Sequence, residues 1–310
     1  MQAVAEPLRQ KHYNATVIDR HDVTEDLFRI RVRPDRGLPK FSPGQYVAMG
    51  MGFWEPRVQP SQFEEVPENK QEKLILRAYS ISCPLLDPSD RLVTCADLDY
   101  LEFYIALVRG ADDSETPPPA LTPRLFGLSR GDRLFVAAKI TGTYTLAGVE
   151  ANDTVLMIST GTGEAPHNAM TAELLRRGHR GKVVNLTTVR YRRDLGYVRE
   201  QQSLMRQFSN YRYLSLTTRE PENLDPQCPA YVGRQYVQDL IKRGELASMV
   251  DDALSPENTH VYLCGNPAMI GFVPPGGAPL LQPGVLTLLQ QAGFTRADAG
   301  CGHVRFEKYW

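Results

Sequence analysis

The residues best suited to chemistry lie together at positions 77–80, directly after an apolar run. Arg77 and Ala78 are followed by Tyr79 and Ser80. An arginine can bind a phosphate, an aromatic ring can cover a flat heterocycle, and a hydroxyl can hydrogen-bond to the edge of that heterocycle. This combination indicates flavin binding.

A second candidate site is the glycine-containing turn at residues 161–166, between an apolar run and an expected helix. Glycine lets a backbone approach a diphosphate, and the start of the following helix supplies partial positive charge. Ala165 and Pro166 stand where the Gly-x-Gly-x-x-Gly pattern would end, so the turn alone is weak evidence for a dinucleotide. Two nucleotide sites in this order nevertheless predict an electron relay.

Length and composition limit the number of domains and the kinds of partner to be expected. The chain has 310 residues, which favours two domains. Its 35 basic and 36 acidic residues give no electrostatic argument for nucleic acid or a membrane as partner. Residues 1–10 lack the pattern of a secretory signal, and no apolar run reaches membrane-spanning length.

The five cysteines are spread out without a Cys-x-x-Cys pair, and the six histidines lack the spacing of metal ligands. We therefore expect a reduced, cytoplasmic protein with no metal and no iron–sulfur centre.

The pattern of apolar residues along the sequence changes near residue 150. Up to that point short apolar runs are punctuated by Gly and Pro, which is typical of an antiparallel barrel or sandwich. The expected strands are 16–18, 27–32, 46–49, 74–81, 101–108 and 134–138. The polar, proline-bearing segments 53–73 and 110–119 are expected to be surface loops, the first long enough for a lid or a docking element.

The second half alternates buried runs with helical stretches, which predicts a parallel sheet. The expected strands are 155–159, 183–189, 213–218 and 261–264, and the expected helices are 166–177, 201–208, 234–242 and 284–292. The predicted fold is an antiparallel β-barrel domain, residues 1–148, followed by an α/β parallel-sheet domain, residues 149–310.

Four segments in order resemble the ferredoxin–NADP reductase family, in its bacterial branch. They are Arg-x-Tyr-Ser at 77–80, Gly-Thr-Gly-x-Ala-Pro at 161–166, Cys-Gly-Asn-Pro-x-Met at 264–269, and the terminal Phe-Glu-Lys-Tyr-Trp. The likeness extends from residue 41 to the last residue. It implies an FAD-binding barrel, an NADP-binding second domain with the flavin in the cleft between them, and electron transfer between NADPH and ferredoxin or flavodoxin.

The resemblance assigns the flavin-binding residues. Arg77 would bind the FAD pyrophosphate, Tyr79 would pack on the isoalloxazine, and Ser80 would bond near flavin N5, with Ala78 between them. Residues 120–125 resemble a Gly-x-Leu-Thr-x-x-Leu turn whose threonine, here Thr122, also meets the FAD phosphates, although Ala120 replaces the glycine. The backbone at Leu107 and Val108 would pack near the FAD.

The end of the chain matches the part of the family that controls access to the flavin. Tyr309 would cover the flavin face where nicotinamide must land, and Trp310 would cover the FAD adenine. Glu307 and Cys264 would border the nicotinamide. Hydride passes directly between nicotinamide C4 and flavin N5, so no side-chain base is required.

The remaining assignments concern NADP(H). The diphosphate and nicotinamide would be held by Thr160, Gly161, Thr162, Gly163, Pro166, Gly265, Asn266 and Met269. Arginines at strand ends would bind the 2'-phosphate, because the guanidinium fork suits phosphate. These arginines are Arg190, Arg199 and Arg219. No acidic residue directly follows the expected strand 183–189 or the expected strand 213–218, so we expect NADPH to be preferred over NADH.

An acidic carrier would require a local basic patch, for which the candidates are Arg9, Lys11, Arg91, Arg124 and Lys308. The chain is expected to act as a monomer. Two alternatives stay open: a reductase component of an oxygenase or hemoprotein system, and a non-catalytic flavin-binding electron-transfer subunit.

Overall fold

The computed structural model describes residues 2–110, 116–250, 254–273, 279–297 and 302–309. The chain divides into two compact units. The first comprises Met1–Cys83 and Cys95–Thr143, and the second comprises Pro84–Thr94 and Tyr144–Trp310. The sequence-based boundary lay at Gly148, and the grouping of Pro84–Thr94 with the second unit was not expected.

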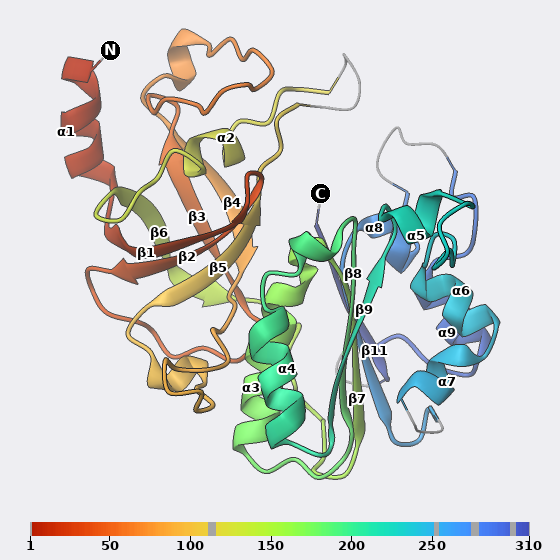
Figure 1. Cartoon of the computed structure of the whole chain (residues 1–310). Coiled ribbons are helices and arrows are strands. Elements are labelled where there is room, and N and C mark those ends of the chain that lie inside the picture. Colours follow the sequence, from red (N-terminus) through yellow and green to blue (C-terminus); the bar gives the residue numbers. More distant parts are fainter. Residues whose placement is uncertain (1, 111–115, 251–253, 274–278, 298–301, 310) are drawn as a thin grey trace. The chain divides into compact units, whose positions relative to one another are not determined.

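The first unit is built on a six-stranded sheet with the order β4-β3-β6-β1-β2-β5, whose pairings are antiparallel, as predicted (Figure 1). Side chains of Phe28, Ile30 and Val32 alternate into its core, as the two-residue period of a strand requires. The strands are β1 Ala15–Thr24, β2 Leu27–Pro34, β3 Tyr46–Gly52, β4 Leu74–Ser80, β5 Leu101–Ala106 and β6 Arg133–Thr141.

Short helical elements complete this unit. They are α1 Gln2–His12, α2 Thr122–Leu125, and the 3-10 turns Glu68–Lys70 and Cys95–Asp97. The helix α1 was not predicted. It is held by Arg9, whose guanidinium binds both carboxylate oxygens of Glu55 at 2.8 and 2.6 Å, and by the Tyr13 hydroxyl, which donates to Glu55 at 2.9 Å.

The second unit contains the predicted parallel sheet, with five strands in the order β11-β10-β7-β8-β9. The strands are β7 Thr154–Thr160, β8 Val183–Val189, β9 Tyr211–Thr217, β10 Thr259–Gly265 and β11 Val304–Lys308. Strand β11 was not predicted; it pairs with β10, so that Cys264 lies opposite Glu307.

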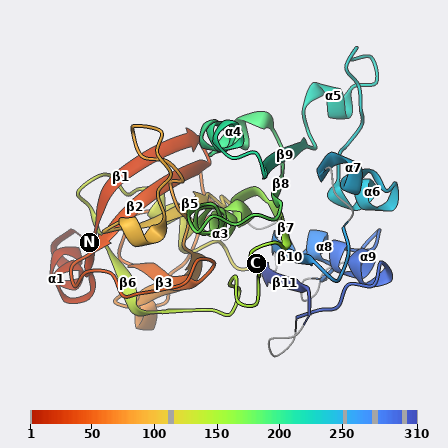
Figure 2. The ribbon, with the colours of Figure 1, turned by 90° about the horizontal axis from the view of Figure 1, so that it is seen from below.

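Helices lie on both faces of the parallel sheet, α3 and α4 on one face and α6, α7 and α9 on the other (Figures 1 and 2). The helices are α3 Glu164–Arg176, α4 Val198–Gln207, α5 Pro221–Leu224, α6 Val237–Lys242, α7 Glu245–Val250, α8 Pro267–Ile270 and α9 Val285–Gln291, with 3-10 turns at Gly161–Gly163 and Arg192–Asp194. Strands β7 and β8 are buried on both faces, which explains their continuous apolar runs. No helix among the described residues has the length and apolar character needed to cross a membrane.

Candidate functional site

The predicted flavin-binding quartet forms the second half of strand β4. Arg77 is opposite Met49 and Ser80 is opposite Tyr46 across the pairing with β3. Arg77 is exposed, and its Nη1 donates to the carbonyl of Leu76 at 2.9 Å. The strand therefore presents a guanidinium near its middle and a buried hydroxyl at its end.

Tyr79 is partly buried and contacts Phe103 edge to face, with ring centroids 6.3 Å apart. Burial raises the pKa of the Tyr79 hydroxyl well above its usual value, and the nearby Arg77 opposes this shift. The ring is therefore a neutral, oriented surface on the same strand as Arg77, while Ala78 between them is exposed.

Thr122 and Val108 are brought together although they lie in different segments. The Val108 amide donates to the Thr122 hydroxyl at 3.1 Å, and the same hydroxyl contacts the Val108 carbonyl at 3.5 Å. The neighbouring Leu107 amide donates to the carbonyl of Asp26 at 2.8 Å. The threonine predicted to meet phosphate thus also fixes the end of the segment that follows β5.

Arg77 and Ala120 line a common hollow of about 520 Å³ in the first unit. This volume lies within the range of small-molecule sites. The other lining residues are Phe53, Glu64, Glu65, Pro67, Lys70, Lys73, Leu74, Ile75, Leu76, Pro117 and Pro118. The structure thus brings the arginine of the quartet and the turn before Thr122 to one site. It adds residues of segment 53–73, which was expected to be a surface loop, long enough for a lid or a docking element.

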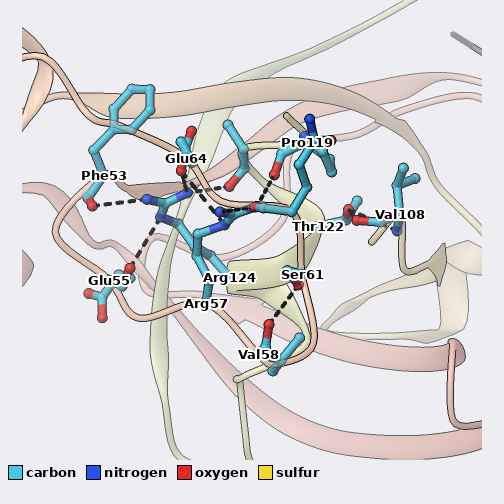
Figure 3. A network of polar contacts seen from close by, with 12 residues as sticks. Phe53, Glu55, Arg57, Val58, Ser61, Glu64, Val108, Pro119, Thr122 and Arg124 are labelled. Carbon is cyan, nitrogen blue, oxygen red and sulfur yellow. Dashed lines mark hydrogen bonds and ion pairs between the residues drawn. The ribbon is translucent and has the colours of Figure 1, made fainter. Parts of the chain in front are cut away.

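Arg124 organises the wall of this hollow. Its side chain is only 3% exposed, and its Nη1 donates to Glu64 at 2.7 Å and to the Ala120 carbonyl at 2.6 Å (Figure 3). Its remaining donors bind the carbonyls of Phe53 and Glu55, each at 3.2 Å. The prediction that Arg124 belongs to an exposed docking patch is therefore wrong, because its charge is buried and paired.

Of the other docking candidates, two form ion pairs, one lies over an aromatic ring, and one is exposed. Arg9 is engaged by Glu55, whose burial opposes ionisation, although hydrogen bonds from Arg9 and Tyr13 outweigh that effect and lower the pKa of the carboxyl. Arg91 is exposed but pairs with Asp87 at 2.6 Å, and Lys308 lies over the Phe272 ring at 4.2 Å. Lys11 is exposed at the end of α1.

In the second unit the glycine turn follows β7 and leads into α3, which begins at Glu164, two residues before the predicted start. Gly161 adopts a left-handed φ of +52°, which favours glycine. A Cβ at Gly163 would collide with the backbone carbonyl of Cys264, so glycine is required there for close approach. Thr162, between them, is partly exposed.

The second turn interlocks with the first. Gly265 has a φ of +119°, and a Cβ there would collide with the side chain of Thr160. The Asn266 amide donates to Thr160 Oγ1 at 2.7 Å, and Asn266 Oδ1 accepts from the Ala268 amide at 2.8 Å to cap α8. The ends of β7 and β10 therefore form one backbone-lined surface at the carboxyl edge of the sheet, where such folds bind ligands.

Two further residues of these turns, Pro166 and Met269, are buried. The Met269 side chain packs in the core of the parallel sheet, so a contact of this residue with a nucleotide would have to come from its backbone.

Cys264, Glu307 and Tyr309 lie beside these turns. The Cys264 thiol is fully buried; this burial, with the charge of Glu307 in the paired strand, raises its pKa well above the usual value. The thiol is therefore neutral and serves as a packing surface. The Tyr309 amide donates to the Gly265 carbonyl at 2.9 Å, which holds the end of the chain at this edge. Trp310 lies outside the described residues.

The arginines predicted to bind the 2'-phosphate do not all lie together. The Arg219 amide donates to the Arg190 carbonyl at 2.9 Å, which places these two exposed residues side by side after β8 and β9. Arg199, on α4, instead has its guanidinium 3.5 Å from Asp90 and is 82% exposed.

Arg234 is an exposed arginine outside the predicted set. It follows Gly233, whose carbonyl accepts from Asn223 Nδ2 at 2.9 Å, and Asn223 belongs to α5, which begins two residues after Arg219.

A buried polar layer supports the start of α3. Gln201 Nε2 donates to Glu164 at 3.0 Å and to Asn168 at 2.8 Å, which ties α3 to α4. His167 Nε2 lies 2.7 Å from the hydroxyl of Tyr144. Complete burial lowers the pKa of His167 to about 3, so the ring is neutral near neutral pH. Among the described residues no group of three or more His, Cys, Asp or Glu side chains is arranged to hold a metal ion.

Comparison with known proteins agrees with this geometry. Residues 157–274 match the family model described as "Oxidoreductase NAD-binding domain". The flavodoxin/ferredoxin–NADP reductase of Escherichia coli (strain K12) is 30% identical over 251 residues, which cover 80% of this chain and 82% of that protein. The ferredoxin–NADP reductase of Pseudomonas aeruginosa is 26% identical over 267 residues, covering 83% of this chain and 86% of that protein.

Solved structures show the same fold. A ferredoxin NADP+ reductase from Neisseria gonorrhoeae, described with bound FAD and NADP, has a TM-score of 0.66 at 17% identity. The match covers 96% of this chain and 98% of that chain. Together with the relatives above, this likeness shows that the chain belongs to the flavodoxin/ferredoxin–NADP reductase family of oxidoreductases.

Proposed function

We propose that this protein is an FAD-dependent enzyme that transfers electrons between NADPH and a small carrier protein, either ferredoxin or flavodoxin. The observation that carries the proposal is the interlocking of the two glycine turns at the carboxyl edge of β7 and β10. This backbone surface can accept a dinucleotide diphosphate, and the names of the relatives supply the carrier.

The first unit fits FAD. Its hollow of about 520 Å³ has Arg77 and Ala120 in its lining, and Tyr79 presents a neutral ring two residues further along β4. In the proposal Arg77 binds the FAD diphosphate, Tyr79 packs against the flavin ring and Ser80 hydrogen-bonds to its edge. FAD, when bound, supplies the capacity to accept a hydride and to release electrons singly.

In the second unit, Gly161 and Gly163 let the backbone approach the NADP diphosphate. Arg190 and Arg219 bind the 2'-phosphate. That Arg199 also binds the 2'-phosphate stays a prediction. Cys264 and Glu307 border the nicotinamide, and the buried thiol packs without a charge. Tyr309 would cover the position of the nicotinamide until that ring enters. The protein's contribution is positioning and exclusion of water, since direct hydride transfer needs no side-chain base.

We further propose that the protein acts as a cytoplasmic monomer without a metal. Its net charge of −1 gives no attraction to nucleic acid or an anionic membrane.

Purified protein tests the proposal. We expect about one FAD per chain, NADPH-dependent reduction of a dye, and NADPH-dependent reduction of at least one member of a panel of ferredoxins and flavodoxins. Dye reduction with every carrier inert would favour the reductase component of an oxygenase or hemoprotein system. Bound flavin that NADPH does not reduce would favour the non-catalytic subunit. Protein that does not bind FAD would contradict the proposed enzyme and both alternatives.

A further inference from the structure

Segment 53–73 forms one side of the hollow that contains Arg77. It contributes Phe53, Glu64, Glu65, Pro67, Lys70 and Lys73 to the lining. The opposite side comes from β4 and from residues 117–120. A segment with no role in the function described so far therefore builds about half of the candidate cofactor site.

The segment is firmly held. Its two ends are joined by the Phe53 amide, which donates to the Lys73 carbonyl at 3.0 Å. The Val58 amide donates to the Pro123 carbonyl at 2.9 Å, and Arg57 bonds to the carbonyls of Gln62 at 2.7 Å and Pro119 at 3.0 Å (Figure 3). The segment is therefore part of the wall and not an independent lid.

Backbone hydrogen bonds also fix the positions of Lys70 and Lys73, from which their side chains extend. Lys70 ends a 3-10 turn, and its amide donates to the Pro67 carbonyl at 2.9 Å. The Lys73 amide donates to the Lys70 carbonyl at 2.9 Å, three residues further along. Both side chains are exposed and line the hollow together with Arg77.

The charge of the lining favours an anion. Glu64 is only 8% exposed, and its carboxylate is neutralised by Arg124 at 2.7 Å and Arg57 at 3.7 Å. Within the part of the chain that the structure describes, no ion pair involves Lys70, Lys73 or Arg77. Three cations therefore face the hollow against one exposed carboxylate, that of Glu65.

The size and the remaining lining favour more than a single phosphate. About 520 Å³ is ample for a nucleotide, and Phe53, Leu76, Pro117 and Pro118 add apolar surface for a base. We propose that Lys70 and Lys73 bind the phosphates of the adenosine diphosphate half of FAD, alongside Arg77. This inference rests on the function proposed above and assigns a binding role to segment 53–73.

The test compares two double variants of the full-length chain after its flavin has been removed. Lys70→Gln with Lys73→Gln removes both charges from the hollow. Lys40→Gln with Lys139→Gln removes two exposed charges of the same unit that do not line it. Each protein is titrated with FAD, riboflavin and ADP at several salt concentrations, and its urea midpoint is measured.

We expect the Kd for FAD and for ADP to rise about tenfold in the first variant, with a weaker salt dependence, because two charge-assisted contacts are lost. The Kd for riboflavin, which has no phosphate, and the urea midpoint should not change, and the control variant should match the unmodified protein. Unchanged FAD affinity in the first variant, or an equal loss for riboflavin, would overturn the inference while leaving the proposed function intact. An unmodified protein that binds no FAD would defeat the proposed function itself.

Discussion

The two candidate sites are built by different means. In the second unit the site is made of backbone, where Gly163 approaches the Cys264 carbonyl and Thr160 binds the Asn266 amide. In the first unit it is made of side chains distant in sequence, since Arg124 reaches back to Glu64 and to the carbonyl of Phe53. A backbone site depends on the absence of Cβ atoms at its glycines. A side-chain site depends on the presence of hydrogen-bonding and ion-pairing partners elsewhere in the chain.

The sharpest test of this difference is Gly163→Ala. The added Cβ would collide with backbone of β10, which cannot move like a side chain, so the two turns must separate. We expect NADPH-dependent dye reduction to fall about 100-fold, the cost of misplacing a bound reactant by roughly 1 Å. FAD content should be unchanged.

Gly161→Ala is the matched control. Its Cβ meets open space, and only the left-handed φ of +52° is strained, at about 1 kcal/mol. Equal losses in the two variants would show that loop strain, and not clearance between the turns, limits the site.

In the first unit the corresponding variant is Arg124→Met. It leaves the Glu64 carboxylate buried without its closest partner, which should lower the free energy of unfolding by about 3–5 kcal/mol. FAD should be lost before the second unit unfolds, as followed by flavin release and circular dichroism during urea titration.

Arg130, which is exposed, provides the control, because Arg130→Ala should change stability by less than about 0.5 kcal/mol. Normal FAD affinity in the Arg124→Met protein would contradict the claim that the contacts of Arg124 with Glu64 and Phe53 shape the hollow.

The arginines of the second unit test the part of that site that does depend on side chains. Replacing Arg190 and Arg219 together by alanine should raise the KM for NADPH about tenfold or more, since charge-assisted contacts to the 2'-phosphate are lost. The KM for NADH should change by less than about twofold, because NADH lacks that phosphate.

Arg199→Ala separates the sequence-based prediction from the observed geometry. If its pairing with Asp90 is its main contact, the ratio of the two KM values should stay near that of the unmodified protein. A larger effect at Arg199 than at Arg190 and Arg219 would reverse the assignment.

The sequence could predict what is local. Strand β8 lies at its expected residues, and the glycine turn sits between β7 and α3, because burial period and turn residues act within a few positions. Helix α1, strand β11 and the Arg124 cluster were missed. Each depends on a partner far along the chain, as Arg9 depends on Glu55, and no local pattern records that partner.

A pH-dependent effect is expected from the neutral polar layer under α3, in contrast with the charged cluster of the first unit. The pKa of His167 is lowered to about 3 in the folded protein from 6.5, so the unfolded chain binds the extra proton below about pH 6.5. The free energy of unfolding should therefore fall as the pH decreases from 6.5 toward 3.

His167→Gln should flatten this slope in urea titrations at several pH values, whereas His21→Gln, at an exposed position, should leave it unchanged. A ring proton of His167 whose NMR shift moves with a midpoint near 6.5 would show that the ring is not held neutral by burial.

The most direct test of the central claim is anaerobic mixing of the purified protein with one equivalent of NADPH or NADH while the visible absorption of bound flavin is recorded. We expect about one FAD per chain and rapid bleaching by NADPH, with slower bleaching by NADH. A protein that holds no FAD, or whose bound flavin stays oxidised in the presence of NADPH, would contradict the central claim.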